Sequence, residues 1–355
     1  MVKLDREQLL AALAEGRQIE QADLSGVDLG GTDLGGGRFR QCSFVGANLS
    51  GAGFAKSFLD KCDFSRASFA GSTLEEGMFR HLTFVGANFS GARLHRCMLQ
   101  HSDFSGADFR QGTISWCMGQ HTNFTGADLR GAIFEKAIMN EACFASANLE
   151  DARLTRATFM KANLQGVSFK RAHMFKCVLR EANLIEQDFS GVTLAIVQFD
   201  GAILQRANFA GSHLSMSNFS GADLTQADCT GITAENCMFM GAILHETRFA
   251  KANLVQSIFS GCNAALADFS GAQMVHAIFK EGICRGTKFC GADLSHADFS
   301  KADLTMADFS RTQLYRAKLH QTIEQDTRFT GALMVMLQRT NDDFRRAEDW
   351  EPPPD

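Results

Sequence analysis

The sequence predicts an all-β solenoid built from square coils of twenty residues, and two nested periods support this prediction. From Leu24 to Met334, every fifth residue is Leu, Phe, Met or Ile with few exceptions, and no insertion or deletion interrupts the phase. A period of five matches neither an α-helix nor a flat β-strand. It indicates a chain that turns a corner every five residues. The exceptions are Gly119, Cys229, Ala234, Ala264, Cys284 and Glu324.

The second period is twenty residues long. Phe44 begins a series of six phenylalanines at twenty-residue steps, and Phe199 begins another. Side chains that stack between successive turns pack best when their sizes match, and aromatic rings favour offset stacking. Four pentapeptides therefore make one coil, with one pentapeptide on each of four faces.

Many of the five-residue units have the form Ala-(Asp/Asn)-Leu-x-x. Ala22–Gly26, Ala107–Gln111 and Ala302–Met306 are examples. The chain thus resembles the pentapeptide-repeat family over about nine tenths of its length. The resemblance implies a right-handed quadrilateral β-helix of about 16 coils, in which the central apolar residue and the small residue two positions earlier point inward.

Residues 1–20 do not follow the five-residue phase and are predicted to form an N-terminal capping helix. Asp5 and Gln8 have the spacing of a capping box, and Gly16 can end the helix. Its expected apolar face consists of Leu9, Leu10 and Leu13. We expect this helix to cover the edge of the first coil, because uncovered strand edges invite association.

The β-helix is predicted to span residues 21–334, and a C-terminal cap and tail to span residues 335–355. The end of the repeats is too apolar for a free linker, so it either caps the last coil or forms a dimer contact. The residues concerned are Leu333, Met334, Val335, Met336 and Leu337. A short helix is expected at Asp342–Arg346, before the proline-containing tail Glu351–Asp355.

The cysteines follow the repeat phase and are explained as core residues. Of the eleven, nine occupy inward positions, and only Cys143 and Cys290 point outward. Cysteine packs as a small apolar residue, and there is no C-x-x-C pair. We therefore expect no metal and no cofactor. So many free thiols, without a signal peptide or membrane span, favour the reducing cytoplasm.

The sequence contains no catalytic constellation, so an enzyme is not expected. It has no phosphate-binding glycine loop, no H-E-x-x-H and no G-x-S-x-G. Asp293, Asp298, Asp303 and Asp308 recur every five residues and therefore point to four different faces. The predicted fold has no cleft that could exclude water.

The third face, centred on Leu34, Phe54 and Leu74, carries what we call the basic strip. Trp116 and Phe175 project from the same face, and only Glu135 opposes the cations. Such a strip can bind nucleic acid or an acidic protein surface, or it can be a solvated face. Because the net charge is −5, a protein partner is favoured and nucleic acid is disfavoured. The basic strip comprises Arg93, His95, Arg96, Lys136, Arg153, Arg156, His173 and Lys176.

The fourth face, centred on Phe39, Leu59 and Phe79, carries an apolar stripe where the repeat normally has Asp, Asn or Ser. Exposed apolar surface of this kind marks interfaces, and methionine suits adaptable ones. Alternatively, one of the chain ends folds back over it. The apolar stripe comprises Phe58, Met78, Met98, Met118 and Ile138.

Beside the apolar stripe runs a histidine column formed by His81, His101 and His121. The column continues with Glu141, Lys161 and Glu181, as an ordinary solvated edge would. A flat ladder does not converge on a tetrahedral metal, so a pH-sensitive contact is favoured over metal binding. Two irregularities also carry predictions. At Gly119 the coil is expected to bend or bulge, and at Glu324 the core is expected to open to solvent.

The leading functional hypothesis is a non-enzymatic scaffold or adaptor that binds another protein through these two faces. Analogy with the family adds a place beside a bacterial type VI secretion or effector system. The competing hypothesis is a DNA-mimicking protein of the quinolone-resistance type that binds gyrase. That mechanism needs a strongly acidic surface, whereas most of the net charge of −5 falls at the chain ends. A third possibility is a structural rod that only dimerises through one end.

Overall fold

The computed structural model describes residues 1–340, which form two compact units: Met1–Leu184, and a second that begins at Ile185. Both units are almost entirely parallel β-structure wound into square coils, and together they contain about 17 turns. The predicted all-β quadrilateral β-helix with one short N-terminal helix is confirmed. The helix predicted at Asp342–Arg346 and the proline tail lie outside the described residues.

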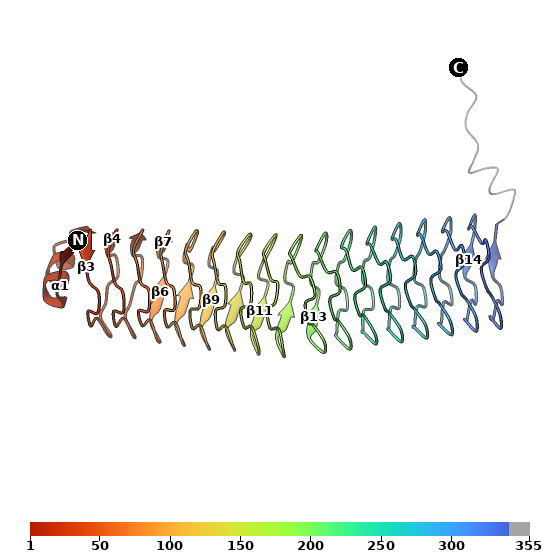
Figure 1. The fold of residues 1–355 in the computed structure, drawn as a ribbon, viewed down its shortest axis with the longest axis horizontal. Helices are drawn as coiled ribbons and strands as arrows, with labels where there is room; N and C mark the ends of the chain where they lie inside the picture. Colours follow the sequence, from red (N-terminus) through yellow and green to blue (C-terminus); the bar gives the residue numbers. More distant parts are fainter. Residues whose placement is uncertain (341–355) are drawn as a thin grey trace, which may run out of the picture. The chain divides into compact units, whose positions relative to one another are not determined.

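The first unit begins with a strand and a helix at the edge of the first coil (Figure 1). Strand β1 (Val2–Lys3) pairs in parallel with β3 (Ala22–Asp23), and helix α1 (Arg6–Ala14) follows β1. Asp5 and Gln8 form the predicted capping box: the Asp5 carboxylate accepts the Gln8 N–H at 2.9 Å, and the Gln8 amide oxygen accepts the Asp5 N–H at 3.0 Å.

The apolar face of α1 differs from the prediction. Leu9 and Ala12 are buried, whereas Leu10 and Leu13 are only half-buried. The helix therefore presents its i, i+3 row to the coil rather than the broader face predicted from its leucines. A small residue at Ala12 permits this close approach.

Short strands recur on two faces of the first unit, each pairing with the equivalent residues twenty positions later. On the fourth face the ladder runs through β2 (Ile19–Glu20), β4 (Arg38–Arg40), β5 (Phe58–Asp60) and β7 (Met78–Arg80). On the third face it runs through β6 (Thr73–Glu75), β8 (Arg93–His95), β9 (Thr113–Ser115), β10 (Ile133–Glu135), β11 (Arg153–Thr155) and β12 (His173–Phe175).

The second unit has the same pairing but fewer assigned strands. They are β13 (Thr193–Ala195), β14 (Lys318–Leu319) and β15 (Gln338–Arg339). Elsewhere single residues form parallel bridges at twenty-residue steps, as between Asn208 and Asp228.

The hydrogen bonds explain why no residue can be inserted without disrupting the coils. The Leu49 N–H donates to the Ser68 carbonyl at 2.7 Å, and the Ser68 N–H donates back to the Ala47 carbonyl at 2.9 Å. Each coil thus satisfies its backbone groups through its neighbours, as buried backbone requires. An inserted residue would shift every later side chain relative to this ladder.

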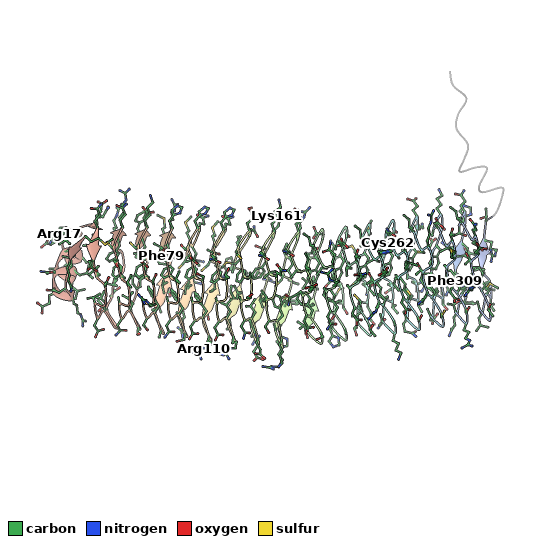
Figure 2. The ribbon with its side chains drawn as sticks, in the orientation of Figure 1. Arg17, Phe79, Arg110, Lys161, Cys262 and Phe309 are labelled. Carbon is green, nitrogen blue, oxygen red and sulfur yellow. The ribbon has the colours of Figure 1, made fainter. Side chains whose placement is uncertain are left out.

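The core consists of the two inward positions of each pentapeptide (Figure 2). In the series that begins at Phe44, successive rings are stacked 4.6–5.2 Å apart, and in the series from Phe199 they are 4.5–5.0 Å apart. The nine cysteines predicted to point inward are buried, and Cys143 and Cys290 are half-buried. The phase assignment of the sequence is therefore confirmed.

The bulge predicted at Gly119 is wrong. The Gly119 N–H donates to the Ile138 carbonyl at 2.7 Å, so the ladder continues without interruption. A Cβ atom added at Gly119 would lie 2.5 Å from the Sδ atom of Met139, which occupies the space in the core. A long side chain in the next coil therefore compensates for the missing one.

The core opens to solvent at the last coil of the second unit, as predicted at Glu324. The Glu324 carboxylate pairs with Arg339 at 2.6 Å, and Phe329 is only half-buried. Leu337 is half-buried as well. Four apolar side chains are exposed at this end: Leu333, Met334, Val335 and Met336.

Candidate interaction surface on the first unit

The structure brings the apolar stripe together as one continuous ladder. Phe58 pairs with Met78 inside the β5–β7 sheet, and parallel bridges continue the ladder to Met98, Met118 and Ile138. Met78 is 38% exposed and Met118 is 36% exposed, whereas Phe58, Met98 and Ile138 are half-buried, so the stripe is partly accessible to a partner. Burial of these side chains against a partner would remove apolar surface from water, which favours association.

Part of the basic strip forms a second ladder at the corner between the third and fourth faces. We call it the corner column, and each of its residues lies two positions before the fourth-face ladder residue of the same coil. Its residues all adopt a left-handed backbone with φ between +51° and +57°, which turns their side chains outward. The corner column comprises Glu76, Arg96, Trp116, Lys136, Arg156 and Lys176.

Aromatic rings and cations contact each other along this corner. The Lys136 Nζ atom lies 4.0 Å from the centre of the Trp116 ring, which is 47% exposed. The Lys176 Nζ atom lies 5.1 Å from the ring of the exposed Phe175. Such contacts hold the cations over the rings without neutralising their charge.

One member of the basic strip is neutralised by a residue that the sequence interpretation left out. Arg96 lies 3.6 Å from Glu76, so the first two residues of the corner column form an ion pair with each other. Lys136, Arg156 and Lys176 have no carboxylate within ion-pair distance among residues 1–340. The unneutralised positive charge is therefore concentrated in the half of the corner column that runs from Lys136 to Lys176.

Arg93 and Arg153 extend this charge onto the third face. Arg153 lies beside His173 in the ladder, and Arg93 occupies the same position three coils earlier. His95 instead shares a hydrogen bond of 2.8 Å with Ser115. The basic strip thus divides into cations without an ion-pair partner and residues, such as Arg96 and His95, that contact neighbouring side chains of the same fold.

The histidine column lies on the opposite border of the fourth face. The rings of His81 and His101 stack 5.2 Å apart, those of His101 and His121 stack 5.0 Å apart, and His121 lies 3.6 Å from Glu141. Between this column and the apolar stripe, Gln100 donates a hydrogen bond of 2.9 Å to Gln120. Parallel stacking keeps the ring nitrogens from converging, and residues 1–340 hold no cluster suited to a metal ion.

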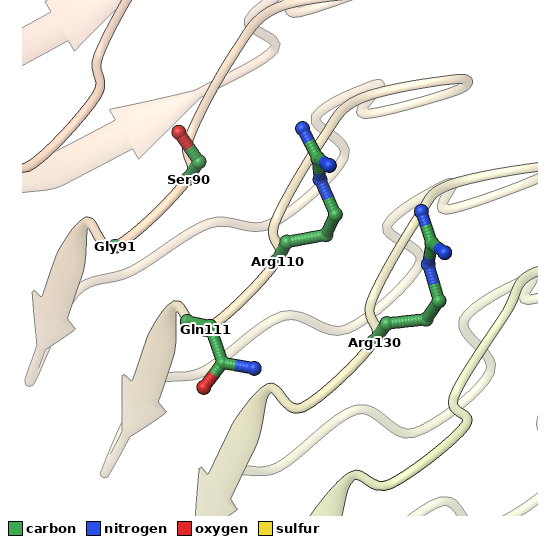
Figure 3. A pocket seen from close by; sticks show the side chains of 5 residues that line it. All are labelled: Ser90, Gly91, Arg110, Gln111 and Arg130. Carbon is green, nitrogen blue, oxygen red and sulfur yellow. The ribbon is translucent and has the colours of Figure 1, made fainter.

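A shallow hollow of about 580 Å³ lies on another face of the first unit (Figure 3). Arg110 and Arg130 line it, but their guanidinium groups are bound by Asp108 and Asp128 at 2.7 and 2.6 Å. These hydrogen bonds lower the pKa of Asp108 and of Asp128. Both arginines are engaged by neighbouring side chains, so this hollow is a weaker candidate than the fourth face.

Sequence interpretation missed a related apolar column in the second unit. Met238, Ile258 and Ile278 occupy the same position in the coil as the apolar stripe, and they are linked by parallel bridges. The twenty-residue period could have revealed this column, because its residues lie at multiples of twenty positions from Met98. No comparable run of unneutralised cations borders them: the equivalent corner holds Asn236, Gln256 and His276.

Within residues 1–340, no helix is both long enough and apolar enough to cross a membrane.

Comparison with known families agrees with the repeat register. A model of the pentapeptide repeat region matches residues 32–109, 152–229, 213–289 and 232–309, and a model of eight pentapeptide repeats matches residues 120–151. The chain therefore belongs to the pentapeptide-repeat family. No curated protein matches the sequence.

Several solved structures resemble the chain. HetL, a pentapeptide repeat protein involved in heterocyst differentiation regulation in the cyanobacterium Nostoc sp. strain PCC 7120, is 20% identical over 94% of both chains, with a TM-score of 0.22. QnrB1, a plasmid-mediated fluoroquinolone resistance protein, is 17% identical over 78% of this chain and 98% of its own, with a TM-score of 0.28. A pentapeptide repeat protein of the Arabidopsis thaliana thylakoid lumen is 22% identical over 28% of this chain and 69% of its own, with a TM-score of 0.21.

Proposed function

We propose that this protein is a non-enzymatic scaffold that binds another protein through the fourth face of the first unit and its bordering corner column. The observation that carries the proposal is the run of Lys136, Arg156 and Lys176, three stacked cations that no described carboxylate neutralises. Charges at this spacing repel one another, so an acidic partner would relieve the repulsion.

The other corner of the fourth face, which holds the histidine column, shows a ladder whose polar side chains pair with one another. There His121 faces Glu141 at 3.6 Å and Lys161 faces Glu181 at 3.6 Å, so nitrogen-bearing side chains and carboxylates alternate from coil to coil. The corner column departs from this alternation from Lys136 to Lys176, beside Ile138, Thr158 and Val178, in the coils that directly follow Met118. An exposed apolar strip that continues into charge of one sign fits a protein-binding site better than a solvated edge.

An accessory role in a bacterial type VI secretion or effector system is the more specific form of this proposal. It rests on analogy with the family, and the identity of the partner tests it. The nearly neutral repeat region argues against the alternative of a gyrase-binding DNA mimic.

The test is affinity capture from the native host with three forms of the full chain: wild type, Met98→Asp/Met118→Asp and Met238→Asp. Met238 is the matched control, because it is 36% exposed like Met118 and has the same position in a coil of the second unit. We expect one set of partners with the wild type and the control, and their loss with the double variant. Identical captures from all three forms would contradict the proposal, provided that circular dichroism shows all three to be folded.

A further inference from the structure

The geometry of the fourth face restricts the shape of the segment that can bind it. The apolar stripe and the corner column run side by side along the stack of coils, and both repeat once per coil. Stacked rings in this unit lie 4.6–5.2 Å apart, which agrees with the inter-strand spacing of about 4.8 Å. A partner that lies along the stack must therefore present one apolar side chain about every 5 Å.

An α-helix meets this requirement and a β-strand does not. Helix positions i, i+3, i+7 and i+10 span about 15 Å, and four stripe residues from Met78 to Ile138 span about 14 Å. Side chains on one face of a strand repeat at about 6.6 Å and lose register after two coils. A strand also cannot add to a ladder edge here, because Met98 donates to Gly77 and Leu99 donates to Met118 through their backbone N–H groups at 2.9 and 2.7 Å.

The charge pattern then sets the composition of the helix on each flank. Lys136, Arg156 and Lys176 span about 10 Å, which matches carboxylates at i, i+4 and i+7 on one side of a helix. On the opposite flank the face offers the Gln100–Gln120 hydrogen-bonded pair and the histidine column, followed by Glu141 and the Lys161–Glu181 ion pair, so polar side chains suffice there. The two flanks differ, which fixes how the helix is rotated about its axis.

Building on the proposed function, we propose that the partner segment is an acidic amphipathic α-helix of about 16 residues that lies along the stack of coils. Apolar side chains toward one end of the helix pack on the apolar stripe, and carboxylates toward its other end pair with Lys136, Arg156 and Lys176. The length follows from the five coil intervals between Met78 and Val178, the last residue of this ladder in the unit. Single-stranded nucleic acid is the competing occupant, since it would use the cations and Trp116 but not the methionines.

The experiment uses the full chain and a fluorescein-labelled, hydrocarbon-stapled peptide of about 18 residues. The peptide has leucine at positions i, i+3, i+7 and i+10 and glutamate along one flank. Two control peptides replace every glutamate by glutamine or scramble the order of residues. Fluorescence anisotropy measures the affinity of each peptide, and of a labelled oligothymidine, at low and high salt.

We expect the acidic peptide to bind, and the glutamine and scrambled peptides to bind at least about tenfold more weakly. Lys136→Glu/Arg156→Glu and Met98→Asp/Met118→Asp should each weaken the acidic peptide by at least about tenfold. Met238→Asp and Lys251→Glu, a surface and a corner substitution in the second unit, should leave its affinity unchanged.

Equal affinity for the scrambled peptide, or undiminished binding by the two double variants, would overturn the helix proposal. So would tighter binding of oligothymidine that Met98→Asp/Met118→Asp does not affect. The proposed function is separable from these outcomes. If no peptide binds, but host partners are captured by the wild type and lost with the double variant, the scaffold function stands and the acidic helix is excluded.

Discussion

The ammonium group of Lys136 lies 4.0 Å from the centre of the Trp116 ring, on a corner where both residues have a left-handed backbone. Stacking at twenty-residue steps creates this contact, because the two side chains leave the backbone in the same direction one coil apart. The pair orders a cation that has no described carboxylate partner and an aromatic ring that is nearly half exposed.

A double-mutant cycle on this pair should reveal a small favourable coupling. We expect the Trp116→Ala and Lys136→Ala substitutions to be less than additive by about 0.5–1 kcal/mol, the usual strength of an exposed cation–π contact. Urea denaturation followed by circular dichroism measures the four stabilities. A coupling of zero within error would show that the lysine is not held over the ring in solution.

Gly119→Ala should destabilise the first unit by about 1–3 kcal/mol, because the new methyl group would meet the Met139 sulfur. Met139→Val shortens the opposing side chain. We therefore expect Gly119→Ala/Met139→Val to be more stable than the sum of the single changes predicts. Thermal unfolding midpoints of the four proteins provide the measurement. Strict additivity would mean that the two coils do not share this space.

Alkaline pH should destabilise the fold through its buried thiols. Burial raises the pKa of Cys177 to about 11, and it raises the pKa of Cys237 and of Cys262 to about 12. Below pH 8.5, the ordinary value of a thiol, these groups are protonated in both states and the native stability is fully present.

As the pH rises from about 8.5 to 11, the unfolded thiols ionise first and stability falls. The loss for Cys177 should approach about 3 kcal/mol at pH 11. Cys177→Ala, compared with its own stability at pH 7, should lose less than the wild type over this interval. An equal loss in both proteins would assign the alkaline effect to other groups.

The protein should not protect DNA gyrase by imitating DNA. Most of the net charge of −5 lies at the chain ends, which leaves the repeats without the acidic surface that the mechanism requires. A gyrase supercoiling assay with and without a quinolone measures both inhibition and protection. Inhibition or protection at near-stoichiometric protein would revive the DNA-mimic hypothesis.

The exposed apolar end of the second unit should hold two copies of the chain together. Leu333, Val335 and Met336 present more apolar surface there than a solvated end retains. Leu333→Asp/Val335→Asp should halve the mass measured by light scattering coupled to size exclusion. Met306→Asp, also exposed but one coil further in, should not. A wild-type protein of monomeric mass would contradict this expectation.

Most of the fold could be predicted because the repeat leaves little choice. A side chain two positions before each central residue is inward whatever its chemistry, so the repeat phase alone predicts the burial of Cys177 and Cys262. The same logic placed Trp116 and Phe175 outside. In a solenoid, position in the period decides burial.

The errors arose where one coil compensates for another. Gly119 gave no sign that Met139 would fill its space, since the compensation is a matter of rotamer and not of sequence phase. The neutralisation of Arg96 by Glu76 was missed because Glu76 lies in the coil before Arg93, the first residue of the basic strip. The partner-binding role of the fourth face remains a prediction, since surface chemistry alone does not identify what it contacts.

The left-handed corners have a further consequence. Lys136 and Arg156 adopt a backbone conformation that costs a residue with a Cβ atom about 1 kcal/mol relative to glycine. Glycine already occupies many other corners, as at Gly126. A corner residue can therefore be replaced by glycine without destabilising the coil, and each corner can carry a different side chain from the corners in neighbouring coils. Within a unit, the side chains presented at successive corners can therefore be changed independently, at intervals of about 4.8 Å.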